Sequence, residues 1–373
     1  MAAPILLTPG PVSTAPATRA AMTTDWPPWD GPFKALTLGI GEKLVTLAGG
    51  TPDEFLTVPI VGSGSYAVEA MAGTLLPRTG ARLLIVCNGN YGRRMETSVR
   101  YMGRDVVTLD LAETEAADPV ALAAMLQADP AITHVAVVHV ETTSGLFNPV
   151  DEIARVVRAA GRRLWVDVVA SLGILPVHMS AWNADAVALS SNKGIEGPPG
   201  LGFVIARRSA LAAVRGNAHS LCLDLEHQAR FFEESGGRFR YTPPTHVIAA
   251  FGAALDAFIA EGGQPARFAR YDANIGVLLD GMRALGFEPI IDRHIQAPVI
   301  ATFHQPGDAR WNFEVLYDTL KAAGFLIFPG KVTQTMPTLR IGCIGQVNVG
   351  DMGRVVEAAA AALVKMGMTS GAR

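Results

Sequence analysis

The most informative stretch of this chain is RLWVDVVASLGILPVHMSAWNADAVALSSNKGIEGPPGLGFVIAR, residues 163–207. It contains three short apolar runs, at residues 163–169, 186–190 and 200–207, and a glycine-containing turn follows each of the first two. Continuous apolar runs of this length are typical of parallel strands that are buried on both faces. The stretch therefore predicts neighbouring strands of one sheet.

The same pattern extends toward the N-terminus. Apolar runs at residues 82–87 and 133–140 also end in turns, and helix-like segments follow them. This alternation of strand and helix predicts an α/β fold with a doubly wound, mostly parallel sheet that is covered on both faces. A helix at residues 246–260 is expected to stop at Glu261-Gly262-Gly263, since glycine commonly follows the last helical residue.

The pattern changes after this helix. We expect a large domain at residues 16–265, a smaller C-terminal α+β domain at residues 266–373, and an N-terminal segment, residues 1–15, that packs near the active site. Within the small domain, the sequence predicts a helix at 271–285, strand-like runs at 297–304 and 325–330, and an alanine-rich closing helix at 351–366.

Composition excludes several classes of protein. The chain has 373 residues, 49% of them hydrophobic, and 31 Lys+Arg against 34 Asp+Glu, which gives a net charge of −3. This balance offers no general attraction for nucleic acid or an anionic membrane. No apolar run is long enough to span a bilayer, and the first residues lack the basic region of a signal peptide, so a cytoplasmic location is expected.

Cysteine and histidine spacing predicts neither disulfides nor a metal site. The three cysteines, Cys87, Cys222 and Cys343, are widely separated and odd in number. His134 and His139 share one apolar run, but their spacing matches no metal-binding motif, and we expect them to be core or edge residues.

Two charged residues stand where strands are expected to end. Asp167 lies inside the apolar run WVDVV, where a carboxylate is costly without a cationic partner. Lys193 lies in a loop bounded by glycines and prolines. Taken alone, such a lysine is usually a solvated surface residue, and such an aspartate is as often an edge residue or a helix cap. Together, they are the two groups that pyridoxal phosphate requires: a Schiff-base lysine and a partner for the protonated ring nitrogen.

A glycine- and serine-rich turn supports this interpretation. Residues 62–69, GSGSYAVE, follow the apolar VPIV and precede a helix. Free N–H groups at a helix start, with the hydroxyl groups of Ser63 and Ser65, predict a site for the cofactor phosphate. A GSGS turn by itself is weak evidence, because such turns are common in linkers.

The chain also resembles the class V aminotransferase group of the fold-type-I pyridoxal phosphate enzymes, nearly from end to end. Its SLCLDL, TPPTH and PGKVTQ pieces are similar to the branch of that group that acts on aminophosphonates. It departs from that branch at Pro27-Pro28-Trp29-Asp30, which bears on the substrate, and at Ser191-Asn192-Lys193-Gly194. The resemblance is carried by LLTPGP (6–11), GSGSYAVEA (62–70), CNGNYGRRM (87–95), HVETTSGLFNP (139–149), VDVVASLGILP (166–176), SSNKGIEGPPGLGFVIAR (190–207), SLCLDL (220–225), RFRYTPPTH (238–246), FPGKVTQ (328–334) and LRIGCIG (339–345).

The resemblance implies a seven-stranded type of sheet, a homodimer with active sites at the subunit interface, and a role for each motif residue. Lys193 would bind the cofactor covalently and move the proton, and Asp167 would pair with the ring nitrogen. Tyr91, unless it is plain core, and Val169 would cover the two ring faces. Thr142 would bond the ring hydroxyl group. The phosphate would be held by Ser63, Gly64 and Ser65, and by Thr242 of the partner subunit, although Thr242 could equally be a turn hydroxyl or a helix cap. Asn192 is a further, weaker candidate for the phosphate.

Arginines are the expected anchors for the substrates. Arg340, in the apolar run TLRIG, is the candidate for a keto-acid carboxylate, because a guanidinium binds a carboxylate through two bonds. Arg93, Arg94 and Arg19 are the candidates for a phosphonate.

The resemblance implies transfer of the amino group of 2-aminoethylphosphonate to pyruvate, giving phosphonoacetaldehyde and L-alanine. Three alternatives remain open at this point. They are an alanine– or serine–glyoxylate aminotransferase, a pyridoxal phosphate lyase acting on a related aminophosphonate, and a cofactor-binding protein without activity.

Overall fold

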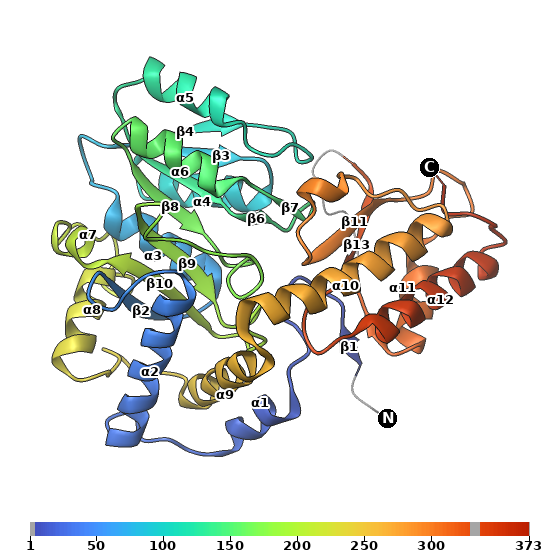
Figure 1. Ribbon diagram of the computed structural model, residues 1–373, viewed down its shortest axis with the longest axis horizontal. Coiled ribbons are helices and arrows are strands. Elements are labelled where there is room, and N and C mark those ends of the chain that lie inside the picture. The colour runs from blue at the N-terminus through green and yellow to red at the C-terminus, as the bar shows by residue number, and fades with distance from the viewer. Residues whose placement is uncertain (1–3, 329–335, 373) are drawn as a thin grey trace.

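The computed structural model describes residues 4–328 and 336–372. Figure 1 shows a larger body built around a central sheet and a smaller body formed by the C-terminal part of the chain. The described N-terminal residues lie with the smaller body, beside the C-terminal helices (Figure 1). The PGKVTQ motif, residues 329–334, lies outside the described residues.

The larger body contains the predicted sheet. Seven strands lie in the order β2-β10-β9-β8-β5-β3-β4. All neighbours pair in parallel except β10, which is antiparallel to both β2 and β9. The prediction of a mostly parallel α/β sheet is therefore confirmed. The strands are β2 (Phe55–Val61), β3 (Arg82–Cys87), β4 (Asp105–Asp110), β5 (Ile132–Val138), β8 (Arg163–Asp167), β9 (Ala184–Ser190) and β10 (Leu201–Arg207), and a separate short hairpin joins β6 (Val140–Glu141) to β7 (Leu146–Phe147).

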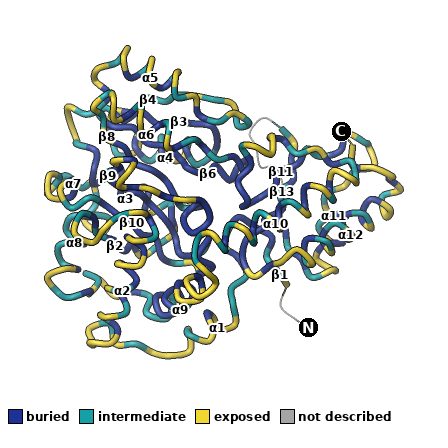
Figure 2. The backbone as a smooth tube through the Cα atoms, viewed as in Figure 1, coloured by how far each residue is buried: buried dark blue, intermediate teal, exposed yellow. Residues whose placement is uncertain are grey.

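Helices cover both faces of this sheet, and each face has its own apolar core. Burial follows this layering: Figure 2 shows the central strands as buried and the outer helices with exposed outward faces. The helices on one face are α2 (Gly31–Leu47), α5 (Pro119–Ala128), α6 (Val150–Ala159) and α9 (Thr245–Glu261), and those on the other are α3 (Gly64–Leu75), α4 (Asn90–Tyr101), α7 (Arg208–Ala212) and α8 (Leu225–Glu234).

The smaller body combines helices with two short sheets. β11 pairs with β13 in antiparallel fashion, and the N-terminal β1 pairs in parallel with β12. The N-terminal strand therefore belongs to the C-terminal body. Its elements are β1 (Ile5–Leu6), β11 (Ile300–His304), β12 (Phe325–Leu326), β13 (Thr338–Gly342), α10 (Gly263–Ala284), α11 (Phe313–Ala322) and α12 (Val349–Lys365), and the remaining short helices of the chain are α1 (Pro16–Ala20), η1 (Ala21–Thr23) and η2 (Arg293–Ile295).

The junction between the two bodies differs from the sequence prediction. α9 ends at Glu261 with Gly262 in the left-handed conformation, as predicted. The next helix was expected at residues 271–285, but α10 begins at Gly263, so the predicted boundary at residue 266 falls inside a continuous helix. Pro265 lies in the first turn of this helix, where proline is tolerated because its missing N–H has no partner to lose.

Within residues 4–328 and 336–372, no single helix is both long enough and apolar enough to cross a membrane. The adjoining pair α9 and α10 meets that criterion only when taken together, across a bend of 83°.

Candidate active site

The site lies at the carboxyl ends of the parallel strands, where open α/β sheets bind their ligands. A cavity of about 270 Å³ opens there. Asp167 is the last residue of β8, Ser190 is the last residue of β9, and Lys193 follows in the next loop. The cavity is lined by Gly10, Ser63, Gly64, Ser65, Val68, Tyr91, Arg94, Met95, Ser98, Asp167, Val169, Ser190, Asn192 and Lys193.

Lys193 is a buried lysine at the wall of this cavity. Only 8% of its surface is exposed. Burial lowers the pKa of its ammonium group to about 8, with Asp167 opposing this effect and Arg340 and Arg94 adding to it. Among the described residues, no hydrogen bond holds Nζ. A substantial fraction of this amine is therefore neutral and nucleophilic near pH 8.

Asp167 presents a buried carboxyl group to the same cavity. Its Oδ1 accepts a hydrogen bond of 2.8 Å from the backbone N–H of Val169. Burial nevertheless raises the pKa of the carboxyl group to about 7. A carboxyl group with so little stabilisation of its charge is suited to a cationic ligand in the cavity.

An anion site lies at the N-terminus of α3. Ser63 precedes the helix, its side chain makes no capping bond, and the first turn contains no acidic residue. The hydroxyl group of Ser65 accepts a hydrogen bond of 3.0 Å from Arg94 Nη1. The positive end of a helix dipole, two hydroxyl groups and one guanidinium thus meet at one end of the cavity.

Tyr91 and Val169 line the same cavity as Asp167 and the start of α3. The guanidinium of Arg94 lies over the Tyr91 ring, 4.9 Å from its centroid. Gly64 approaches Val169 so closely that a Cβ atom at residue 64 would lie 2.8 Å from Val169 Cγ2. Only glycine at position 64 therefore lets α3 start this near to the end of β8.

Arg340 belongs to the smaller body and does not line the cavity, but it is near enough to Lys193 for its charge to help lower the pKa of that lysine. It lies on β13, and its Nη1 donates a hydrogen bond of 2.8 Å to the backbone carbonyl of Thr142. Its Nε is buried without a hydrogen-bond partner among the described residues. Thr142 is buried and does not line the cavity. Its contact with Arg340 is made through its backbone carbonyl.

The N-terminal segment forms part of the cavity wall through Gly10. From the sequence, this segment was expected only to pack near the active site. Gly10 has a φ of +133°, and a Cβ atom there would lie 2.5–2.8 Å from the end of the Lys193 side chain. The segment is held by β13 and its continuation, since Gly342 donates to the Leu7 carbonyl at 2.9 Å and Gln346 to the Ser13 carbonyl at 2.9 Å.

Three predicted site residues lie elsewhere. Arg93 forms ion pairs with Asp110 (2.8 Å) and Glu96 (3.3 Å). Arg19 is exposed on α1 and donates to the carbonyl of Thr14. Thr242 lines a separate cavity beside Tyr66 and Val61.

Sequence reasoning missed Glu141, which is fully buried under the start of α4. Its Oε2 accepts from the Tyr91 backbone N–H at 3.1 Å, and its Oε1 accepts from the Thr143 hydroxyl group at 2.6 Å. Burial raises the pKa of this carboxyl group despite these bonds. Glu141 thus fixes Tyr91 at the positive end of a helix. The sequence did contain one indication of this residue, namely a glutamate at the end of the apolar run VAVVHVE, residues 135–141.

Comparison with known proteins agrees with this geometry. The family model for aminotransferase class-V matches residues 60–311. The chain is 48% identical over 365 residues to the 2-aminoethylphosphonate–pyruvate transaminase of Burkholderia ambifaria (strain MC40-6), covering 98% of this chain and 97% of that protein. It is 47% identical over 365 residues to the 2-aminoethylphosphonate–pyruvate transaminase 1 of Burkholderia lata, with 98% of each chain covered.

Solved structures extend the likeness to the fold. A crystal structure of pyridoxamine–pyruvate aminotransferase from Mesorhizobium loti superposes with a TM-score of 0.87 at 26% identity, covering 98% of this chain and 93% of that one. Alanine–glyoxylate aminotransferase from Nostoc sp. gives a TM-score of 0.88 at 24% identity, covering 97% and 96%, which shows a shared fold only. The chain therefore belongs to the class-V aminotransferases and, within them, to the family of the 2-aminoethylphosphonate–pyruvate transaminases.

Proposed function

We propose that this protein transfers the amino group of 2-aminoethylphosphonate to pyruvate, yielding phosphonoacetaldehyde and L-alanine. The observation that carries the proposal is the identity of 48% over 98% of the chain with transaminases of that name. The cavity supports it, because a buried lysine, a buried aspartate and an anion site lie together around one volume.

Pyridoxal phosphate fits the residues of this cavity. Asp167 offers a buried carboxyl group that lacks a cationic hydrogen-bond partner among the described residues. The start of α3 offers a phosphate the hydroxyl group of Ser63, which makes no capping bond, and that of Ser65, which only accepts a bond from Arg94. When bound, the cofactor would take up the amino group and withdraw electrons from the substrate carbon. Lys193, Asp167, Tyr91 and Val169 would hold its ring, and Ser63, Gly64, Ser65 and Asn192 would hold its phosphate. The predicted bond from Thr142 to the ring hydroxyl group is not part of this proposal, because Thr142 does not line the cavity.

Lys193 would also carry the proton. Its amine lies at the cavity wall, and burial brings its pKa down to about 8, close to the pH at which a general base works best. It would take a proton from the substrate carbon that bears the amino group and return one to the corresponding carbon of the keto acid.

Two arginines would hold the charged ends of the substrates. Among the described residues, the bond to Thr142 engages only Nη1 of Arg340, and a keto-acid carboxylate would bind the remaining guanidinium N–H groups. Of the three arginines predicted for the phosphonate, Arg94 alone lines the cavity, and we assign it that role. Arg93 is taken up by two carboxylates, and Arg19 is exposed on α1.

A homodimer completes the proposed site. Thr242 lies outside this chain's own catalytic cavity, near the exposed side chains of Tyr66 (56% exposed) and Tyr241 (52% exposed). Apolar side chains exposed in a group favour burial against another chain. Thr242 of the partner subunit would then reach the phosphate. This assembly and a cytoplasmic location stay predictions from the sequence.

The test mixes the purified protein with pyridoxal phosphate and 2-aminoethylphosphonate in the absence of a keto acid, and records the absorbance of the bound cofactor. We expect a change that pyruvate reverses while L-alanine appears. A response to alanine or serine with glyoxylate, but not to the phosphonate, would indicate the glyoxylate branch. Release of ammonia from a related aminophosphonate in the absence of any keto acid would indicate a lyase. Lys193→Ala is the control that must lose every response.

A further inference from the structure

Glu196 lies in the same loop as Lys193 and is almost completely buried. Its exposed fraction is 3%, and its backbone N–H donates to the carbonyl of Lys193 at 2.9 Å. It has a φ of +60°, although it is not a glycine. Such a conformation persists only where surrounding contacts enforce it. The side chain of Glu196 supplies those contacts.

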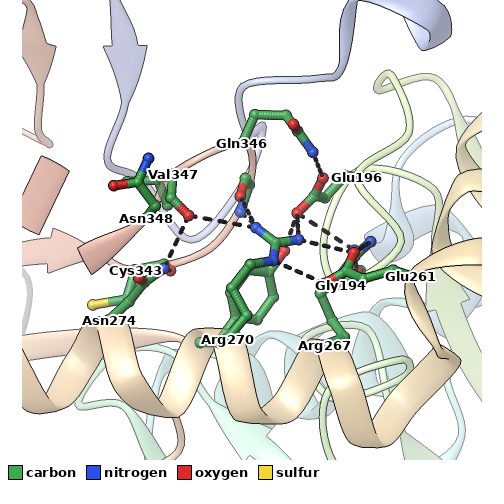
Figure 3. Close-up of polar contacts among 12 residues, drawn as sticks. Gly194, Glu196, Glu261, Arg267, Arg270, Asn274, Cys343, Gln346, Val347 and Asn348 are labelled. Atoms are coloured by element: carbon green, nitrogen blue, oxygen red, sulfur yellow. Dashed lines mark hydrogen bonds and ion pairs between the residues drawn. The ribbon is translucent and has the colours of Figure 1, made fainter. Parts of the chain in front are cut away.

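Each oxygen of this carboxylate has its own partners, and Figure 3 shows them converging from α10 and from the residues after β13. Oε1 accepts from Arg270 Nη2 at 2.7 Å and from the hydroxyl group of Tyr271, and Arg267 Nη1 lies 3.4 Å away. Oε2 accepts from Gln346 Nε2. Burial and the neighbouring Glu196 charge raise the pKa of Tyr271, which keeps its donor proton.

Charge within this cluster is balanced. Arg267 and Arg270 also pair with Glu261, at 2.7 Å and 2.8 Å. Burial would raise the pKa of Glu261, but hydrogen bonds from the two arginines outweigh it and hold the pKa below its ordinary value. Two arginines thus face two glutamates, as buried charges require. Of the two glutamates, Glu196 alone also accepts hydrogen bonds from side chains other than arginine within the described part of the chain, namely from Tyr271 and Gln346.

Glu196 and the two arginines that it binds join the two halves of the site. On the lysine side, Arg267 Nη1 donates to the carbonyl of Gly194, next to Lys193. On the side of Arg340, Arg270 Nη1 donates to the Gly345 carbonyl at 2.8 Å, and the Gly345 N–H donates to the Tyr271 hydroxyl group at 3.0 Å. Gly345 and Gln346 continue directly from β13, the strand that carries Arg340.

We propose that Glu196 is a positioning residue that fixes the Lys193 loop relative to the Arg340 strand, and so sets the distance between the proton-carrying amine and the carboxylate-binding guanidinium. This inference rests on the roles proposed above for Lys193 and Arg340. It explains why a glutamate, and not glycine, occupies a left-handed position between two glycines of the loop.

Glu196→Gln and Glu261→Gln form a matched pair of variants. Each removes one negative charge from the same two arginines, but only the first changes a residue of the lysine loop. For Glu196→Gln, we expect kcat/KM for pyruvate to fall roughly tenfold to a hundredfold, the scale of a small misplacement, with a smaller fall for the aminophosphonate. The circular dichroism of the bound cofactor should change too. Glu261→Gln should lower the melting temperature. It should leave kcat/KM for pyruvate within about twofold of wild type and leave the circular dichroism of the bound cofactor unchanged.

Equal kinetic behaviour of the two variants, with only their melting temperatures lowered, would overturn the positioning role. If Glu196→Gln does not fold, Gln346→Leu removes the bond to the Arg340 side without altering charge. It should raise the KM for pyruvate while the melting temperature stays near that of wild type, and an unchanged KM would overturn the role. Failure of the wild-type protein to react with the aminophosphonate would instead count against the proposed function.

Discussion

The backbone of Gly10 lies against the side chain of Lys193, so that a Cβ atom at residue 10 would lie 2.8 Å from Nζ. A carbon atom and a nitrogen atom that are not bonded to each other do not normally come as close as 2.8 Å. The N-terminal segment therefore defines where the lysine amine can stand. This segment is anchored to the smaller body, since the Gly342 N–H donates to the carbonyl of Leu7.

Gly10→Ala is expected to displace the lysine. The added methyl group would move the end of Lys193, and we expect turnover to fall by about a hundredfold, as for a misplacement of about 1 Å. Steady-state kinetics with both substrates measures this. Gly80→Ala is the matched control, because Gly80 also has a positive φ, +70°, but no atom lies within 4 Å of its Cβ position. Wild-type turnover in Gly10→Ala would contradict the contact.

Asp167→Asn is expected to stabilise the protein without cofactor. The pKa of the folded carboxyl group is about 7, above its unfolded value of 3.8. Between these values the folded state binds more protons than the unfolded state, so this group's contribution to stability is present below pH 4 and is lost as the pH rises to 7. The asparagine avoids that loss, on the order of 4 kcal/mol.

Thermal melting of the two apoproteins at pH 4 and pH 8 measures this difference. The variant should melt higher at pH 8 and equally at pH 4, while its turnover with cofactor falls by at least about a hundredfold. Asp185→Asn is the opposite control, because Asp185 pairs with Arg163 at 2.9 Å and its loss should lower the melting temperature at pH 8. A lower melting temperature for Asp167→Asn at pH 8 would contradict the assigned cause.

The sequence was sufficient to predict the sheet and the place of the site. Parallel strands deliver the residues that follow them to one edge, so residues 167 and 193 and the turn at 62–65 were expected together, and they do line one cavity. The helix cap at Gly262 was also predictable, because left-handed glycine is a local signal.

Contacts between distant segments could not be predicted in the same way. The pairing of Ile5 with Phe325 joins the two ends of the chain and leaves no local pattern. Glu141 and Glu196 occupy positions where propensity alone favours neither burial nor, for Glu196, a φ of +60°. Their roles depend on partners that only the folded chain brings close. Of the candidate arginines, only the structure separates Arg94 from Arg93, since adjacent helical residues point in different directions.

The rate of cofactor attachment to the apoprotein should report the pKa of Lys193. Attachment requires the neutral amine, and burial lowers the pKa to about 8. Stopped-flow absorbance should show a rate that rises about tenfold per pH unit below pH 8 and levels off above it. A rate that keeps rising to pH 10 would indicate an ordinary, exposed lysine.

Arg340→Lys should weaken the binding of pyruvate much more than the binding of 2-aminoethylphosphonate. Lysine keeps the charge but cannot reproduce a two-bond contact with a carboxylate, and it loses the bond from Nη1 to Thr142. Loss of one charge-assisted hydrogen bond corresponds to roughly a tenfold to hundredfold rise in KM. Initial rates with each substrate varied in turn separate the two effects. Equal losses for both substrates would remove Arg340 from the carboxylate role.

Arg94 and Arg93 allow the phosphonate assignment to be tested with adjacent residues. Arg94→Gln should raise the KM for 2-aminoethylphosphonate roughly tenfold to a hundredfold and leave that for pyruvate nearly unchanged, because the cavity loses the cation beside Ser65. Arg93→Gln should change neither KM, since Arg93 is paired with Asp110 and Glu96. The affinity of each apoprotein for pyridoxal phosphate must be measured in parallel, because Arg94 also borders the predicted phosphate site. The variant Arg94→Gln could instead weaken the binding of the cofactor and leave the KM for the phosphonate unchanged at saturating cofactor. That result would show that Arg94 binds the cofactor phosphate and that another group binds the phosphonate of the donor.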